Sequence, residues 1–288
     1  CDANIFYINK SREFWKNTNL RMDNIFEAIN TTDVEKIEFN PELKKDFLFI
    51  GTLYKGKGLD LLLEAYNKFY KQSSCNTKLR IVGAGSEREV LEQYVKDNGL
   101  QDNVAFHGAI YDEKEILKIF QQSLLCFSPT QAGLSVPKSM GYGVPFVSRK
   151  DAITGGEIYH IQNGVNGIMY EKDEDLSAIM LDAFENRIKY IDMGRRAMDY
   201  YYSKATNEIK AEGVIDAINY VITMMKNIAI INNVDFGSTG QISLNLHRNL
   251  LAKGYRSYFC YGRGASPTNS SMKKIGSFLS VNIHALMV

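Results

Sequence analysis

Residues 78–99, KLRIVGAGSEREVLEQYVKDNG, join a short apolar run to a helical pattern through two closely spaced glycines. The run Leu79–Val82 is largely apolar, as in a strand buried inside a parallel sheet. The helical pattern begins directly after Gly83 and Gly85. A strand that turns into a helix at glycines is the building unit of doubly wound α/β sheets.

The same unit recurs on both sides of this stretch. One further apolar run precedes it and four follow, at residues 46–51 (DFLFIG), 103–108 (NVAFHG), 123–130 (SLLCFSPT), 143–148 (GVPFVS) and 166–170 (NGIMY). Helical patterns lie between the earlier runs, as in LDLLLEAYNKFYKQ (59–72) and EKEILKIFQQ (113–122). Because strands that alternate with helices are joined by right-handed crossovers, the sequence predicts an α/β fold with a Rossmann-like doubly wound parallel sheet.

Glycines gather where these predicted strands end. In open α/β sheets ligands bind outside the carboxyl ends of the strands, and glycine lets the backbone approach a ligand closely. Helix starts at the same edge offer unpaired N–H groups to anions. The series therefore predicts a site for a mononucleotide or a diphosphate, and its members are Gly51, Gly56, Gly58, Gly83, Gly85, Gly108, Gly133, Gly155 and Gly156.

Composition restricts the partners. Lys and Arg (34) nearly balance Asp and Glu (33), so no net field favours nucleic acid or an acidic membrane. The four cysteines form no CxxC pair and the four histidines lack metal-ligand spacing, so we expect neither a metal nor another cofactor. No apolar run could span a bilayer and no signal peptide opens the chain. These features predict a cytoplasmic protein.

The strand and helix pattern restarts late in the chain. Residues 176–225 are expected to be helical cover for the sheet, and residues 226–264 then show a strand, a GSTG loop, an amphipathic helix and a second strand. Such a restart is typical of a new domain. The chain opens with Cys1 and ends in an apolar stretch at Val288, so we expect it to be incomplete at both ends.

Residues 47–205 resemble the C-terminal, donor-binding domain of the family 4 (group 1) glycosyltransferases, which have the GT-B architecture. The segments that carry the resemblance, in family order, are FIGTLYKGKGLDLLLEAY, LRIVGAGSEREVLEQYVKDNGLQDNVAFHGAI, GYGVPFVS and NGVNGIMY. Residues 226–264 resemble the start of the N-terminal domain of a similar enzyme. The resemblance implies three segments: 1–45 as the end of a preceding domain and linker, 46–223 as the donor-binding domain, and 224–288 as a partial second N-terminal unit.

Two explanations of this order remain open. A junction at Met224/Met225 would join adjacent genes or a fused chain, whereas a circular permutation would fold the last segment against 47–205. We favour the junction, because roughly sixty residues are too few for a Rossmann-like half.

The resemblance also implies the cations of the site. Lys57 aligns with the lysine that reaches the donor diphosphate, and Thr52 stands where its arginine partner is expected. The family has a Glu-x7-Glu pattern that holds the donor sugar and ribose, but Thr130 and Lys138 occupy those two positions here. Lys138 cannot accept a hydrogen bond from a ribose hydroxyl, so we interpret it as a phosphate contact or a surface lysine.

Further donor-binding residues follow from the strand ends. At the loop before the next helix, Gly133, Leu134 and Ser135 are expected to present backbone amides to the diphosphate, with Ser135 as the cap. Gly51 and the pair Gly83 and Gly85 are expected to form walls of the site, the pair near the nucleobase, with Phe106 close to the base.

One carboxylate and one further loop complete the set. Glu157 follows two glycines where the family has an acidic residue near the donor, and it is the candidate catalytic residue. The alternative is that Glu157 only stabilises the start of a helix through the helix dipole. In the second fragment Gly237, Ser238, Thr239 and Gly240 are expected to form a glycine loop beside the phosphates.

The predicted function is transfer of a sugar from a nucleotide-sugar donor to a glycan or lipid-linked acceptor in polysaccharide biosynthesis. The resemblance implies retention of anomeric configuration and no essential metal. Peripheral contact with the inner face of the membrane stays an open alternative. We expect the chain alone to bind donor weakly and to turn over little. A non-catalytic nucleotide-binding fragment and a nucleotide-sugar epimerase of the same architecture are the alternatives.

Overall fold

A computed structural model describes residues 3–221, 227–264 and 270–275. The chain divides into two compact units. The first, here called the sheet unit, is Asp33–Ala205. The second, here called the split unit, combines Cys1–Thr32 with Thr206–Val288.

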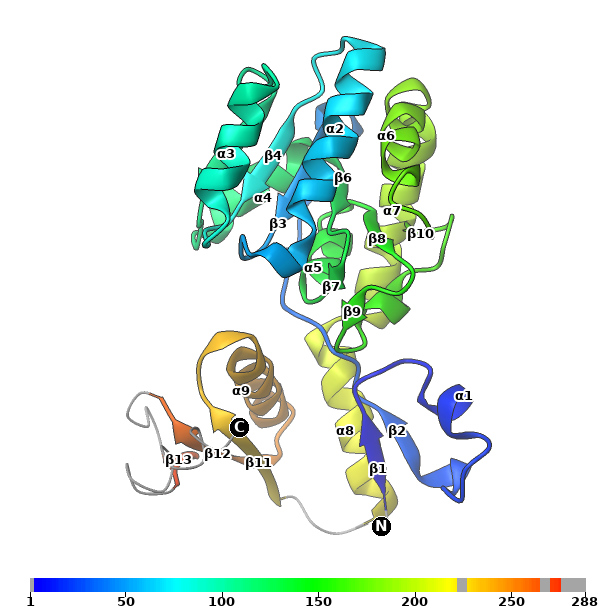
Figure 1. Cartoon of the computed structure of the whole chain (residues 1–288). Helices are drawn as coiled ribbons and strands as arrows, with labels where there is room; N and C mark the ends of the chain where they lie inside the picture. Colours follow the sequence, from blue (N-terminus) through cyan, green and yellow to red (C-terminus); the bar gives the residue numbers. More distant parts are fainter. Residues whose placement is uncertain (1–2, 222–226, 265–269, 276–288) are drawn as a thin grey trace. The chain divides into compact units, whose positions relative to one another are not determined.

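A parallel sheet of six strands forms the sheet unit, in the order β10-β8-β6-β3-β4-β5 (Figure 1). All six predicted strands are present, as β3 (Asp46–Ile50), β4 (Leu79–Val82), β5 (Val104–Gly108), β6 (Ser123–Phe127), β8 (Phe146–Arg149) and β10 (Gly167–Tyr170). The chain builds outward from β3 to β5 and then crosses to β6 on the other side of β3. The predicted Rossmann-like doubly wound fold is therefore confirmed, and the strand order reverses between β3 and β6.

Helices cover both faces of this sheet. They are α2 (Leu59–Ser73), α3 (Arg88–Asp97), α4 (Glu113–Gln122), α5 (Ser135–Gly141), α6 (Asp175–Glu185) and α7 (Arg187–Lys204). Residues of α2, α3 and α6 share one buried cluster with Leu125 and Phe127 of β6. Cys126 lies between those two residues and so points to the opposite face, where its thiol lies beside Ser139 of α5.

The sheet unit also contains short elements near the strand ends. The two-stranded parallel pair β7 (Gln131–Ala132) and β9 (Ile153–Thr154) lies outside the main sheet. Three 3₁₀ helices span Pro41–Leu43, Lys55–Lys57 and Glu157–His160.

The split unit combines a small strand pair with a second sheet. Its elements are β1 (Asn4–Phe6), α1 (Ser11–Trp15), a 3₁₀ helix (Met22–Asn24), β2 (Ile25–Glu27), α8 (Asn207–Val221), β11 (Asn227–Val234), α9 (Gly237–Ala252), β12 (Arg256–Arg263) and β13 (Met272–Lys274). Parallel strands β11, β12 and β13 form the second sheet. Val214 of α8 shares a buried cluster with Ala28, which follows β2, and with Leu250 of α9.

These units do not coincide with the three predicted segments. Helix α8 belongs to the split unit because it packs on β2 and α9, whereas the sequence placed it with the sheet. The strand, helix and strand predicted for residues 226–264 are present as β11, α9 and β12. The predicted junction at Met224/Met225 lies outside the described residues, and the assignment of the segments to domains stays a prediction.

The predicted glycine loop of the second fragment is wrong in its local structure. Gly237, Ser238, Thr239 and Gly240 form the first turn of α9, because the helix begins directly after Phe236. The Asn232 side chain at the end of β11 donates to the Thr239 carbonyl at 3.1 Å and so ties this turn to the strand. A role beside phosphates stays a prediction.

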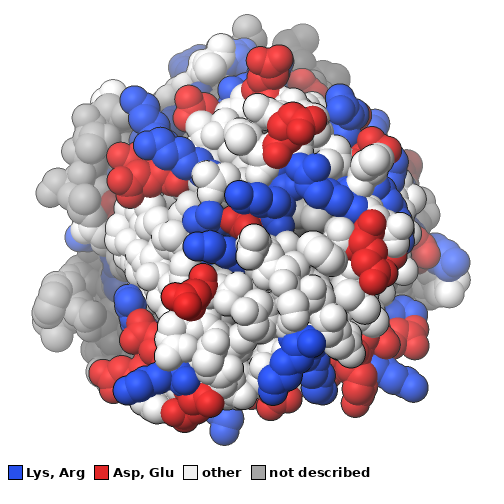
Figure 2. Space-filling model, turned by 90° about the horizontal axis from the view of Figure 1, so that it is seen from above, with Lys and Arg blue, Asp and Glu red and all other residues white. Residues whose placement is uncertain are grey.

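Surface charge follows the composition. On the face seen in Figure 2, acidic and basic side chains are interspersed and uncharged areas lie between them. Within the described ranges, no helix is both long and apolar enough to cross a bilayer. The expected lack of nucleic-acid binding, the cytoplasmic location and peripheral membrane contact stay predictions.

The first testable prediction concerns the contact between β3 and β4 at their carboxyl ends. A Cβ at Gly83 would lie 1.8 Å from the Gly51 carbonyl oxygen, and Gly83 has a φ of +146°. Gly83→Ala should lower the free energy of unfolding by about 2 kcal/mol or more. The positive φ strains the backbone of an alanine and its Cβ overlaps the Gly51 carbonyl, and these two costs add. Urea unfolding followed by circular dichroism measures this.

Gly133→Ala is the matched control. A Cβ at Gly133 would meet no atom within 4 Å, so its effect should stay within about 0.5 kcal/mol. Equal stability of the two variants would contradict the proposed contact.

Candidate functional site

Backbone hydrogen bonds continue past the ends of the central strands and hold three corners together. The Gly51 N–H donates to the Val82 carbonyl at 2.9 Å, and the Gly83 N–H donates to the Gly108 carbonyl at 2.8 Å. These corners line a pocket of about 410 Å³ together with the segment after β5; the lining residues are Ile50, Gly51, Thr52, Val82, Gly83, Ala84, Ala109, Ile110 and Tyr111. None of these side chains is charged, so the pocket suits a flat, uncharged ring.

Lys57 lies next to this pocket. A Cβ at Gly51 would be 3.8 Å from Lys57 Cε, so the lysine stem passes over Gly51, which also lines the pocket. Partial burial lowers the pKa of the Lys57 ammonium below its usual value, while the charge of Glu157 acts in the opposite direction. A bound anion would remove part of that desolvation cost, which makes Lys57 a suitable phosphate contact.

Glu157 is the carboxylate of the site. It is buried, with 5% of its surface exposed, and begins the 3₁₀ helix that follows β9. Its Oε2 accepts hydrogen bonds from the Gly155 N–H at 2.9 Å and from the Thr154 hydroxyl at 3.1 Å. The turn therefore fixes the carboxylate, and its charge reaches Lys57 from the opposite side of the switch point.

The loop after β6 connects these two groups. The Thr130 hydroxyl donates to the Gly56 carbonyl at 2.6 Å, one residue before Lys57. On the other side, the Ile153 N–H donates to the Thr130 carbonyl at 2.9 Å, on the strand that leads to Glu157. Thr130 thus contacts the turn of Lys57 and the strand that leads to the turn of Glu157.

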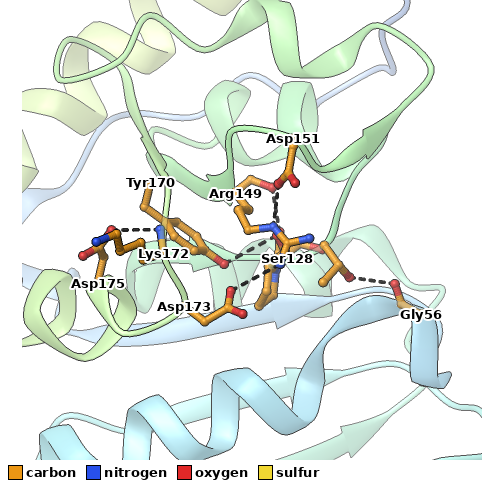
Figure 3. A network of polar contacts seen from close by, with 11 residues as sticks. Gly56, Ser128, Arg149, Asp151, Tyr170, Lys172, Asp173 and Asp175 are labelled. Carbon is orange, nitrogen blue, oxygen red and sulfur yellow. Dashed lines mark hydrogen bonds and ion pairs between the residues drawn. The ribbon is translucent and has the colours of Figure 1, made fainter.

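Neighbouring strands fix this loop in turn. Figure 3 shows Ser128, Arg149 and Tyr170 around it. The Ser128 hydroxyl donates to the Gln131 carbonyl at 2.7 Å, and the Arg149 N–H donates to the Pro129 carbonyl at 3.1 Å. The Arg149 guanidinium pairs with Asp151 at 2.5 Å and with Asp173 at 3.5 Å. These contacts hold the loop on β8 and β10.

The predicted cap of α5 is wrong. Ser135 is the first helical residue, and Leu134 takes the cap position without a side-chain hydrogen bond. The turn closes earlier than expected because the Val136 N–H donates to the Gly133 carbonyl at 2.9 Å. A contact between the backbone amides of this first turn and a diphosphate stays a prediction.

Lys138 has a partner within the protein. Its ammonium lies 2.7 Å from Glu113 Oε1, at the start of α4, and the Tyr142 hydroxyl donates to the other oxygen of that carboxylate at 3.3 Å. This contact uses one of the three N–H donors of the Lys138 ammonium. The phosphate role of Lys138 stays a prediction.

Two residues predicted near the nucleobase, Phe106 and Gly85, do not line the pocket. Phe106 packs against the core cluster of α2 and α3, because its side chain points to that face of β5. Gly85 packs on the Leu53 backbone, where a Cβ would lie 2.1 Å from the carbonyl oxygen. Gly51, Thr52 and Gly83 do line it, as expected.

The segment Ala109–Tyr111 lines the pocket although the sequence analysis did not select it. Tyr111 is 90% exposed, which is unusual for a large aromatic side chain beside an apolar pocket. The signal in the sequence is an aromatic residue three positions after Gly108, the glycine that ends β5.

Metal ligation has little support in the described part of the chain. Among those residues, no three His, Cys, Asp or Glu side chains gather as the ligands of an ion would. The expectation that no metal or other cofactor is needed stays a prediction.

The sequence matches the family described as Glycosyl transferases group 1 over residues 30–200, more than half of the chain. The chain belongs to this family.

Curated relatives are similar over the same region. An uncharacterized glycosyltransferase of Methanocaldococcus jannaschii is 29% identical over 163 residues, which cover 54% of this chain and 40% of that protein. N-acetyl-alpha-D-glucosaminyl L-malate synthase of Bacillus anthracis is 25% identical over 169 residues, which cover 58% of this chain and 43% of that protein. The chain therefore spans less than half the length of these relatives.

Solved structures of glycosyltransferases share the fold. TarM of S. aureus, crystallised with Fondaparinux, alpha-GlcNAc-glycerol and UDP, gives a TM-score of 0.62 at 22% identity, covering 76% of this chain and 44% of TarM. HepE of Anabaena, crystallised with UDP and glucose, gives a TM-score of 0.60 at 16% identity, covering 76% of this chain and 63% of HepE. These likenesses confirm the predicted GT-B type of fold.

The second testable prediction concerns the charge of Glu157 at Lys57. Because this carboxylate raises the pKa of Lys57 against the effect of burial, Glu157→Gln should lower that pKa further. The amide oxygen can still accept the Gly155 N–H, so the turn should be retained. Titration of ¹³C-methylated lysines by NMR measures the change.

Glu113→Gln is the control, since Glu113 pairs with Lys138. It should leave the pKa of Lys57 unaltered. An unaltered pKa in Glu157→Gln as well would show that the two groups do not interact.

Proposed function

We propose that the sheet unit binds the donor of a sugar transfer, a UDP-sugar, with the base in the pocket beside Tyr111 and the diphosphate at Lys57. The observation that carries this proposal is the continuity of the two subsites: Gly51 lines the uncharged pocket and also lies under the Lys57 stem. The uridine nucleotide is proposed because TarM and HepE were both crystallised with UDP.

The proposed reaction moves a hexosyl group, with retention of anomeric configuration, to a glycan or lipid-linked acceptor in polysaccharide biosynthesis. Departure of the diphosphate builds negative charge, which a fixed ammonium and backbone N–H groups can stabilise. Lys57 and the first turn of α5 supply such groups. Glu157, held by Thr154 and Gly155, is proposed to lie beside the donor as the catalytic carboxylate.

The third testable prediction is the affinity for the diphosphate. Calorimetry should show that the chain binds UDP, and that it prefers UDP to GDP and ADP. Lys57→Gln should weaken UDP binding about 10- to 100-fold, because it removes a partly buried charge-assisted contact. Lys55→Gln is the matched control, since this exposed lysine lies on the same turn.

Three results would count against parts of the proposal. Failure to bind any of the three nucleotides would refute donor binding. Equal losses in Lys57→Gln and Lys55→Gln would assign the effect to general charge. UDP-sugar that binds without transfer, even in a longer protein with an acceptor domain, would favour the non-catalytic alternative.

The fourth testable prediction concerns Tyr111. An aromatic ring that stacks on a base contributes about 1–3 kcal/mol, so Tyr111→Ala should weaken UDP binding about 10-fold. Binding of inorganic pyrophosphate should be unaffected, because this ligand has no base. A loss of pyrophosphate binding in Tyr111→Ala would contradict the placement of the base. Tyr111→Phe is the control and should bind UDP as the wild type does.

A further inference from the structure

We propose that Thr130 is a positioning residue, which holds the turn of Lys57 at a fixed place relative to Glu157. It thereby sets the charge arrangement that receives the donor diphosphate. This inference rests on the proposed function.

The side chain of Thr130 holds the lysine turn. Its hydroxyl donates to the Gly56 carbonyl at 2.6 Å (Figure 3, at Gly56). Its methyl group fills the space beside Gly58: a Cβ there would lie 2.8 Å from Thr130 Cγ2. Gly58 has a φ of +66° and is the N-cap of α2, so the turn packs closely beside Thr130 at this point.

The main chain of Thr130 is bonded to the strand that leads to the turn of Glu157. Its carbonyl accepts the Ile153 N–H at 2.9 Å, and the next residue, Gln131, pairs with Ile153 in the β7–β9 ribbon. That ribbon ends at Thr154, whose hydroxyl donates to Glu157. Thr130 therefore bonds the turn of Lys57 through its side chain, and its carbonyl bonds the strand that leads to the turn of Glu157.

A second bond strengthens the same connection. The Tyr54 hydroxyl donates to the Gln131 side-chain oxygen at 2.5 Å. Tyr54 starts the turn that contains Lys57, so two neighbouring residues of the loop hold two places on that turn. Thr130 bonds the carbonyl of Gly56, the residue directly before Lys57, whereas Gln131 bonds the side chain of Tyr54.

The position of the Lys57 turn matters because interactions between charges depend on their distance. The energy between charges varies inversely with their distance, and binding groups must be held within about 0.5 Å to act together. The hydroxyl proton of Thr130 is used within the protein, on Gly56. Its effect on a diphosphate therefore passes through Lys57.

The fifth testable prediction separates this role from a direct contact and from general stability. Thr130→Val keeps the shape and loses the hydroxyl, and it should weaken UDP binding about fivefold to tenfold. Thr130→Ser keeps the hydroxyl and should restore binding to within about twofold of the wild type. Uridine, which lacks phosphate, should bind equally to all three proteins, as measured by NMR titration.

The decisive experiment measures the effect of Thr130→Val in a protein that already carries Lys57→Gln. If Thr130 acts through Lys57, adding Thr130→Val to Lys57→Gln should cause no further loss of UDP affinity. Independent losses that multiply would refute the positioning role, and so would wild-type affinity in Thr130→Val. A loss of uridine binding in Thr130→Val would indicate general damage and refute it as well. Failure of the wild type to bind UDP would instead refute the proposed function.

Discussion

The close approach of Gly83 to the Gly51 carbonyl is the constraint on which the site depends. A side chain at position 83 would overlap the main chain of β3, so only glycine lets the two strand ends meet. The Gly51, Gly83 and Leu53 N–H groups then extend the ladder past the regular strands, each with a bond of 2.8 or 2.9 Å. Because the ladder continues, the corners after β3, β4 and β5 remain in register and form one pocket.

Electrostatics at the switch point follow from this geometry. Lys57 is drawn over Gly51 into a partly buried place, where its charge is less well solvated than that of an exposed lysine. Glu157 compensates in part, and its own carboxylate is satisfied by Gly155 and Thr154. Lys138 is balanced by Glu113, so its charge adds little to the field that a ligand would meet. A negatively charged ligand beside Lys57 would offset the part of the desolvation cost that Glu157 does not.

The sequence predicted the sheet unit well because its signals are local. Each strand is a short apolar run and most of the turns that follow carry glycine, so all six strands and the helices between them could be read in order. Of the predicted donor-binding residues, Gly51, Thr52 and Gly83 line the pocket at these strand ends and Lys57 lies beside it, while their roles stay predictions. Phe106 does not line this pocket, because a strand residue can face either side of a sheet and the pattern near it did not specify which. Its place near the base stays a prediction.

Contacts between distant segments could not be predicted in this way. Nothing near Lys138 indicates that it pairs with Glu113, and nothing near α8 indicates that it packs on β2. The bond from Thr130 to Gly56 joins residues 74 positions apart, so its partner has no local signal either. At the positions of the two family glutamates, Thr130 now bonds a backbone carbonyl and Lys138 bonds a carboxylate. Both side chains have thus taken partners within the protein, which leaves Lys57 and Glu157 as the charges that the fold brings together at the switch point.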